Sequence, residues 1–211
     1  MTHAVRRTRT PLTAGVHRNG LRFAAVDAGK SNGMARYVEL RRHTDNDGDA
    51  LSEEGVRAAL EIGRGLAGGY ALLVSSAAQR ATQTLACFAC MLRDEVPGGA
   101  VVEAGLRSQV EDRWRAAYKR AGSGDLEALR KADPELVDED SAVLGAALRR
   151  VIERLPEGGT ALAVGHSPTN EAAVLGLTGS VVEPMPKGAG VLVVAEGDHA
   201  HAEPLPRAER S

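Results

Sequence analysis

The sequence is poor in aromatic residues and has no long apolar run. Aromatic side chains make up only 3% of its 211 residues, so the core must be built mainly from alanine, valine and leucine. This scarcity disfavours proteins that bind single-stranded nucleic acid by stacking bases on aromatic rings. No apolar run approaches the roughly 18 residues of a membrane span, and a formal net charge of −2 provides no overall basic surface. We therefore expect neither a nucleic acid nor a membrane as partner.

Cysteine is almost absent as well. The only two cysteines, Cys87 and Cys90, lie three residues apart inside an apolar helical stretch. A redox site or half of a metal site is one interpretation, but thioredoxin-type chemistry places such a pair at the start of a helix. We expect two buried thiols of the core instead. Scarce cysteine and the lack of a secretory signal favour the cytoplasm.

Charge is distributed unevenly along the chain. Residues 1–33 hold six basic side chains and one acidic one, whereas residues 34–211 hold the other 20 basic and 27 acidic side chains, a net charge of −7. The first segment lacks helical or strand periodicity, so we expect residues 1–33 to be a disordered or misassigned extension, with a transit peptide as the alternative. Met34, directly before the first expected strand, is a hypothetical true start. We assign residues 34–196 to one domain and residues 197–211 to a loose tail.

Short apolar runs alternate with helical patterns. The runs are rich in valine and leucine, as expected for strands buried on both faces. Such alternation predicts an α/β fold with three layers, in which helices flank a mostly parallel central sheet. The expected strands are residues 36–41, 71–75, 161–165 and 191–195, with 100–103 as a weaker candidate, and the expected helices are residues 51–66, 77–92, 111–121, 126–131, 141–155 and 168–175.

Arginine and histidine follow several of the expected strands. Arg42 and His43 follow the first strand, Arg80 lies one helical turn after the second, and His166 follows a later one. In α/β sheets, ligands collect beyond the carboxyl ends of the strands. Guanidinium groups grip phosphate oxygens through planar forks of donors, a neutral imidazole can attack phosphorus, and a protonated one stabilises charge on the transferred group. No cluster with metal-ligand spacing accompanies them, so we expect a phosphate site that needs no metal.

Four stretches, in the same order, resemble the histidine phosphatase superfamily, which includes the cofactor-dependent phosphoglycerate mutases. The Arg-His-Gly of that family, at the end of its first strand, corresponds to residues 40–44 (LRRHT). Its Leu-Thr-x-x-Gly corresponds to residues 51–55 (LSEEG), and its Ser-Ser-x-x-x-Arg-Ala-x-x-Thr to residues 75–84 (SSAAQRATQT). Its second histidine, which follows a strand and a glycine, corresponds to His166. The resemblance covers about residues 36–180 and implies a phosphoglycerate mutase-like fold.

The resemblance also implies a mechanism. His43 would accept the phosphoryl group as a phosphohistidine, while Arg42, Arg80 and His166 hold its oxygens, and water would then release phosphate. The stretch typical of the true mutases is missing, which favours hydrolysis over mutase action. We therefore expect a metal-independent, cofactor-free phosphatase that acts on phosphomonoesters or phosphohistidine.

Two positions depart from the family pattern. Thr44 stands in place of glycine, and we expect its hydroxyl to add a hydrogen bond to the phosphate. The proton-donating carboxyl group of the family would fall at Ser108, which cannot serve as an acid. We expect Glu111, in the first turn of its helix, to replace it, with Asp112 and Glu103 as alternatives.

These departures leave a second function open, that of a catalytically weak or inactive relative that binds a phosphorylated ligand or partner. A carboxyl group near the leaving oxygen would favour the enzyme. The expected partner is a small phosphorylated substrate or a phosphoprotein, and the acidic body disfavours extended polyanions. Trp114 and Tyr118 share one face of a helix, where we expect packing or a lid more than substrate contact. Ser167 is the expected N-cap of the following helix.

Overall fold

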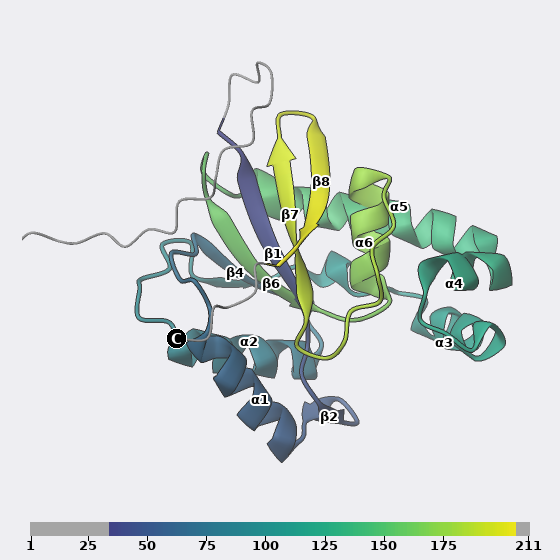
Figure 1. The fold of residues 1–211 in the computed structure, drawn as a ribbon, viewed down its shortest axis with the longest axis horizontal. Helices are drawn as coiled ribbons and strands as arrows, with labels where there is room; N and C mark the ends of the chain where they lie inside the picture. Colours follow the sequence, from purple (N-terminus) through teal and green to yellow (C-terminus); the bar gives the residue numbers. More distant parts are fainter. Residues whose placement is uncertain (1–33, 206–211) are drawn as a thin grey trace, which may run out of the picture.

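A six-stranded sheet forms the centre of the molecule (Figure 1). The computed structural model describes residues 34–205. The strands β1, β4, β5 and β6 run parallel, whereas β7 is antiparallel to β1 and β8 is antiparallel to β7. The order is β5-β4-β6-β1-β7-β8, with β1 (Arg36–Arg42), β4 (Leu72–Ser75), β5 (Ala100–Val102), β6 (Thr160–Gly165), β7 (Gly190–Glu196) and β8 (His199–Pro204). The expected mostly parallel central sheet is confirmed.

Helices cover both faces of this sheet (Figure 1). The helices are α1 (Glu53–Arg64), α2 (Gln79–Met91), α3 (Glu111–Ala121), α4 (Leu126–Ala132), α5 (Pro134–Glu153) and α6 (Thr169–Thr178), with a short 3₁₀ helix at Ala104–Leu106. Successive side chains of β4 point to opposite faces: Leu73 packs with α1 and α2, whereas Leu72 and Val74 pack with the side of α5 and α6. The three-layer prediction is therefore confirmed.

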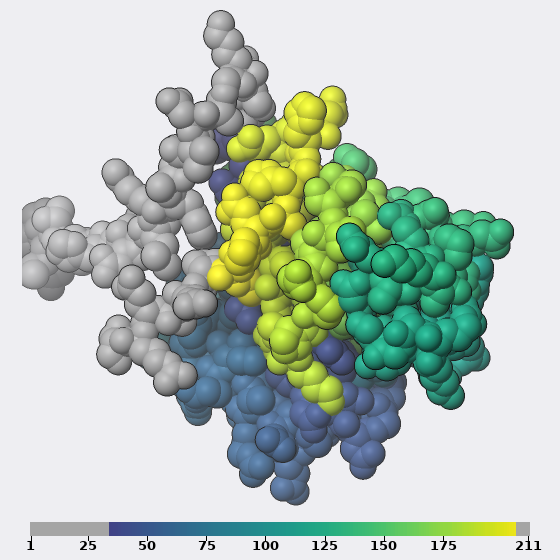
Figure 2. Space-filling model, turned by 45° about the vertical axis from the view of Figure 1, so that its right-hand side comes forward, coloured from purple at the N-terminus to yellow at the C-terminus, as the bar shows by residue number. Residues whose placement is uncertain are grey.

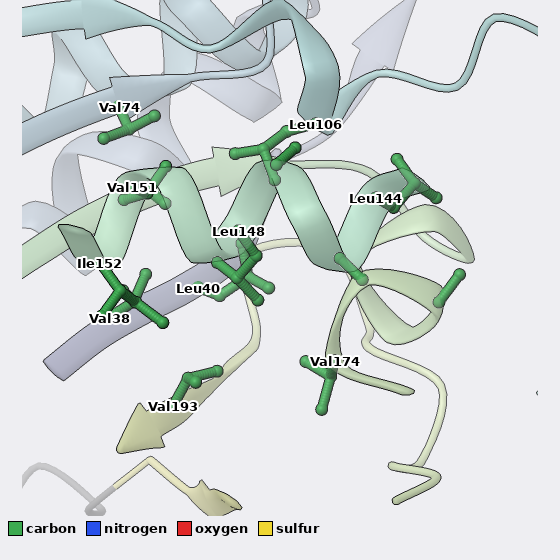
Figure 3. Close-up of a cluster of buried hydrophobic side chains, with 14 of the residues drawn as sticks. Val38, Leu40, Val74, Leu106, Leu144, Leu148, Val151, Ile152, Val174 and Val193 are labelled. Atoms are coloured by element: carbon green, nitrogen blue, oxygen red, sulfur yellow. The ribbon is translucent and has the colours of Figure 1, made fainter. Parts of the chain in front are cut away.

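The larger core cluster lies between α5 and the middle of the sheet (Figure 3). Leu148 and Val151 of α5 are fully buried with Val38 and Leu40 of β1 and with Val193 of β7. Burying one such side chain stabilises the fold by about 1.5–3 kcal/mol. This packing holds the end of β1, and with it the residues that follow, in a fixed position.

Part of the segment expected to be a loose tail is structured. His199–Pro204 forms β8, which pairs with β7 at the edge of the sheet. Its polar sequence hides the strand because an edge strand exposes one face to solvent and needs no apolar run. The prediction of a loose tail is therefore wrong for these residues, and the expected extension at 1–33 lies outside the described residues.

Other boundaries differ for local reasons. The short strands β2 (Asn46–Asp47) and β3 (Ala50–Leu51), which form a separate pair, were not expected. Helix α5 begins at Pro134 and not at residue 141, because the Asp133 side chain caps the Leu136 amide at 3.2 Å and proline suits the first helical turn. Within residues 34–205, no helix has the length and apolar character needed to cross a membrane.

The two cysteines are free and only partly protected. Cys90 is exposed, so the expectation of two buried core thiols is wrong for it, and Cys87 meets it only in part because it is half-buried at the edge of a core cluster. Both lie on α2, whose buried side is formed by neighbours such as Phe88. Burial raises the pKa of the Cys87 thiol, which lowers its reactivity.

Candidate active site

The carboxyl ends of the strands bring the predicted arginine and histidine residues together. Arg42 is the last residue of β1, His43 follows it, and His166 follows β6. The His43 and His166 ring centroids lie 5.2 Å apart. Arg80, in the first turn of α2, places its Nε 3.3 Å from His43 Nε2. Arg42 lies close enough to both rings to contribute to their lowered pKa values.

His43 is held as a neutral imidazole whose Nε2 carries no proton. Its Nδ1 lies 2.7 Å from the Thr44 carbonyl oxygen. Because a carbonyl only accepts, Nδ1 carries the proton and Nε2 is left with the lone pair. Burial, aided by the charges of Arg80 and Arg42, lowers the pKa of His43 to about 4. At neutral pH the ring therefore presents an unprotonated Nε2, which accepts the N–H of Arg80 Nε.

His166 is neutral as well in the absence of a ligand. Its Nε2 lies 2.9 Å from Ser76 Oγ, and its buried Nδ1 has no hydrogen-bond partner among residues 34–205. Burial and the charge of Arg80 lower its pKa to about 3. The expected protonated His166 therefore requires a bound phosphate, whose negative charge favours the imidazolium.

The stretch at residues 75–84 fixes Arg80 through its hydroxyl groups. Ser75 Oγ lies 2.7 Å from Thr82 Oγ1. Thr84 donates its hydroxyl to the Arg80 carbonyl at 2.8 Å and accepts the Thr44 amide at 3.2 Å. The contact between Ser75 and Thr82 joins β4 to α2, and Thr84 joins α2 to the loop that carries His43, so the serine and threonine residues of this stretch have structural roles.

The turn that leads into α2 is strained. Ala77 has a φ of 73°, in the left-handed region that side chains other than glycine rarely adopt. It lies between Ser76, which contacts His166, and the helix that carries Arg80. Strain of this kind is retained where the surrounding structure determines a functional geometry.

Thr44 has a structural role in this arrangement. Its side chain is buried and its hydroxyl donates to the Gly55 carbonyl at 2.8 Å. That bond uses the single hydroxyl proton, so the expected hydrogen bond from Thr44 to phosphate is not available.

Gly55 approaches the same loop so closely that a Cβ atom there would lie 1.9 Å from the Asp45 carbonyl oxygen. Packing thus requires the glycine at position 55. Ser52 caps α1, because its side-chain oxygen accepts the Gly55 amide at 3.0 Å.

Of the three candidate proton donors, only Glu111 lies at the site. It is in the first turn of α3 and lines a cavity of about 440 Å³ together with Arg80, His166 and Ser108. Its carboxylate is already bound by Arg107, which donates Nε at 2.5 Å and Nη2 at 3.4 Å. Sequence reasoning located this carboxyl group but missed its arginine partner.

The two alternative donors are engaged elsewhere. The Asp112 side chain is 92% exposed and pairs with Arg115. The Glu103 side chain is 9% exposed and pairs with Arg150 and Arg154, at and just after the end of α5. Neither carboxyl group lines the cavity.

Asn170, which the sequence reasoning missed, joins the two strands that end at the site. Its Oδ1 accepts the His166 amide at 3.1 Å, and its Nδ2 donates to the Arg41 carbonyl at 3.0 Å. The side chain therefore positions the backbone of β6 relative to that of β1. A polar residue in the first turn of an apolar helix, directly after a candidate catalytic histidine, was the available signal.

Glu171 supports Arg42 from within the core. It is fully buried, and its Oε1 accepts both the Ser167 hydroxyl at 2.7 Å and the Met185 amide at 2.6 Å. The Met185 carbonyl in turn accepts Arg42 Nη1 at 2.9 Å. Burial raises the pKa of Glu171. Ser167 is therefore not the N-cap that the sequence indicated; Pro168 holds that position.

Asp49 occupies the other side of Arg80. It lies between β2 and β3, and its Oδ1 accepts Arg80 Nη1 at 2.5 Å. Its side chain is 48% exposed, so a phosphate that binds Arg80 competes with a partly solvated carboxylate. The pair holds the guanidinium in place.

Comparison with solved structures shows which fold this is. A phosphoglycerate mutase from Bacillus anthracis is 18% identical, with a TM-score of 0.62, and the match covers 83% of this chain and 94% of that one. The fold is that of the histidine phosphatase superfamily. A phosphoserine phosphatase from Entamoeba histolytica, in complex with 3-phosphoglyceric acid, is 15% identical with a TM-score of 0.57, over 79% of this chain and 94% of that one.

A third histidine phosphatase fold shows the same likeness. A mycobacterial glucosyl-3-phosphoglycerate phosphatase is 17% identical with a TM-score of 0.53, and the match covers 81% of this chain and 98% of that one. No protein-family model and no curated protein matches the sequence. At these identities the histidine phosphatase likeness concerns the fold, and the function has to be argued from the site itself.

Proposed function

We propose that the protein is a phosphatase that transfers the phosphoryl group of a phosphomonoester first to His43 and then to water. His43 Nε2 attacks phosphorus, and the bond from phosphorus to the ester oxygen breaks as that oxygen takes up a proton. A water oxygen then attacks phosphorus, the phosphorus–nitrogen bond breaks, and neutral His43 and phosphate result. The observation that carries this proposal is the hydrogen bond from His43 Nδ1 to Thr44, which leaves Nε2 unprotonated beside Arg80.

The remaining groups would act by charge and position. Arg42 and Arg80 neutralise the phosphate oxygens, and His166, protonated when phosphate is bound, donates a further hydrogen bond. Positioning and electrostatic stabilisation contribute most of the catalysis in phosphoryl transfer. These cationic groups supply the charge that a metal ion supplies in other phosphatases, so we propose metal-independent turnover. Two of the structural neighbours are phosphatases by name, which supports the reaction class.

This proposal is tested by hydrolysis of p-nitrophenyl phosphate in the presence of a chelator. Turnover should persist with the chelator and fall by about 10³-fold or more in His43→Ala, because the nucleophile is lost. The matched control is His199→Ala, which removes an exposed histidine of β8. Wild-type activity in His43→Ala, or activity that the chelator abolishes, would contradict the proposal.

Glu111 is the proposed proton donor. Glu111→Gln should lower kcat by about 10²–10⁴ for an alkyl phosphate, whose leaving oxygen needs a proton. The same variant should change p-nitrophenyl phosphate turnover far less, because nitrophenolate leaves readily without one. Asp112→Asn, one residue away and outside the cavity, serves as the control. An equal loss on both substrates would show that Glu111 acts otherwise, for example by orienting Arg107.

The ion pair between Arg107 and Glu111 favours one alternative function, the binding of a phosphorylated ligand without turnover. The Glu111 carboxyl group already accepts two hydrogen bonds from Arg107, which competes with its use as a proton donor, and general acid help is worth about 10²–10⁴ in rate. The two functions differ in one measurement: a pure binding protein would bind phosphate in calorimetry and release none from either ester.

A further inference from the structure

The cavity at the site extends well beyond the phosphate position. From Arg80 and His166 it continues between α3 and the residues at the start of α6, with a volume of about 440 Å³. Figure 2 shows the α3 and α4 segment, in teal, on the side of the molecule beside the segment of α6. A phosphoryl group fills a small part of this space, so the remainder is available to the part of the substrate that leaves.

The wall on the α3 side is aromatic and rigid. Trp114 is 4% exposed, and its Nε1 donates to Asp140 at 2.6 Å, which fixes the indole. Tyr118, one turn further along α3, is 51% exposed and lines the same cavity, which Pro168 lines from the α6 side. Ligand pockets usually have apolar and aromatic walls that bind the ligand and a few polar groups that orient it. The exposed ring of Tyr118 in a cavity that also holds Glu111 fits this description. We therefore interpret this wall as a binding surface for an apolar group.

The cavity also presents one unpaired positive charge. Arg115 pairs with Asp112, and Glu111 is bound by Arg107. Lys119 lines the cavity and forms no ion pair with any of residues 34–205. Tyr118 lines the same cavity, so the charge and the aromatic wall belong to one pocket.

We propose that the natural leaving group is an alcohol with a flat apolar body and a second negative charge. The body packs between Tyr118 and Pro168, and the anion binds Lys119. This inference rests on the proposed function, in which the phosphoryl group goes to His43 and the bond from phosphorus to the ester oxygen breaks. The ester oxygen takes up a proton, and the alcohol then leaves along the wall of α3.

A binding measurement tests this independently of turnover. The probe is a benzylphosphonate with a para-propanoate group, compared with the same molecule as the primary amide. The phosphonate occupies the phosphate position and cannot be hydrolysed, while the two probes differ in one charge far from phosphorus. Calorimetry on the full chain should show the propanoate binding about fivefold more tightly than the amide, the effect of one partly solvated ion pair.

Matched variants locate the effect. The preference for the propanoate should disappear in Lys119→Gln and persist in Lys131→Gln, which removes an exposed lysine of α4 outside the cavity. Tyr118→Ala should weaken both probes by the same several-fold factor, because it removes aromatic contact and no charge. Equal binding of the two probes by the wild type, a preference retained in Lys119→Gln, or no binding of either probe would overturn the inference.

The outcomes also separate this inference from the proposed function. Selective phosphonate binding by a protein that hydrolyses no ester would leave the cavity assignment standing and refute catalysis by His43. Hydrolysis of p-nitrophenyl phosphate without any propanoate preference would do the reverse.

Discussion

At the scale of single residues, the two site histidines connect stability to pH. Burial lowers the pKa of His43 to about 4 and that of His166 to about 3, both from an ordinary value of 6.5. In the unfolded chain both rings bind protons below about pH 6.5, whereas in the folded protein each ring binds a proton only when the pH approaches its lowered pKa. Because the unfolded state binds more protons over this interval, stability rises with pH between them.

The expected size is about 1.4 kcal/mol per pH unit for each histidine. The check is urea unfolding from pH 4.5 to 7 of the wild type and of the double variant His43→Asn, His166→Asn. As pH falls below 6.5, the free energy of unfolding should decrease more steeply for the wild type than for the double variant. The difference in slope should correspond to at most two protons, one for each histidine. Equal slopes would mean that the rings titrate normally in the folded protein.

The residues that meet at the site could be predicted where their position relative to a strand determines their location. Arg42 ends β1, and His43 and His166 directly follow β1 and β6, so the parallel sheet brings them to one edge. Hydrogen-bond partners could not be predicted in the same way: the Thr44 hydroxyl is taken by Gly55, a residue on another element. The Arg107 partner of Glu111 is nearby in sequence but depends on the geometry of the turn before α3.

At the scale of elements, the contact between α5 and α6 is set by small residues. A Cβ atom at Gly176 would lie 1.7 Å from the Ser141 carbonyl oxygen, and one at Gly145 would lie 2.4 Å from the backbone of Gly176. The two helices can therefore meet at this point only without side chains. Because α6 starts with the residues that hold His166 and Arg42, this contact also positions the site.

Gly176→Ala should therefore destabilise the fold by about 2–4 kcal/mol, because the helices must separate or bend. Gly65→Ala is the matched control: its nearest heavy atom would be the Ile62 carbonyl oxygen at an ordinary 3.5 Å. Thermal unfolding of both variants measures the difference. A Gly176→Ala protein as stable as the control would show that the helices are not in such close contact.

The apolar pattern predicted most elements and missed those with little apolar character. The central strands and most helices follow from apolar runs and from caps such as Ser52. Strand β8 is polar because it lies at an edge, and α5 begins early because Asp133 and Pro134 form its first turn. Both depend on partners or caps that an apolar pattern does not report.

At the scale of the whole molecule, charge is divided between the body and the site. Residues 34–211 have a net charge of −7, yet Arg42, Arg80 and Arg107 all lie close enough to His166 to contribute to its lowered pKa. A positive site within a negative body attracts a small phosphoester locally and repels a long polyanion. This division supports the proposal of a small phosphorylated substrate, and it follows from the fold, since the arginines are distant in sequence.

The central claim is that His43 carries the phosphoryl group, and trapping that intermediate tests it most directly. The protein is mixed with excess p-nitrophenyl phosphate and quenched in base, in which a phosphohistidine survives, and its peptides are then weighed. The account predicts that the peptide containing His43 gains the mass of one phosphoryl group, that acid removes it, and that His43→Ala shows no gain. Rapid turnover by the wild type with the phosphoryl group on another residue, or with His43→Ala equally active, would contradict it.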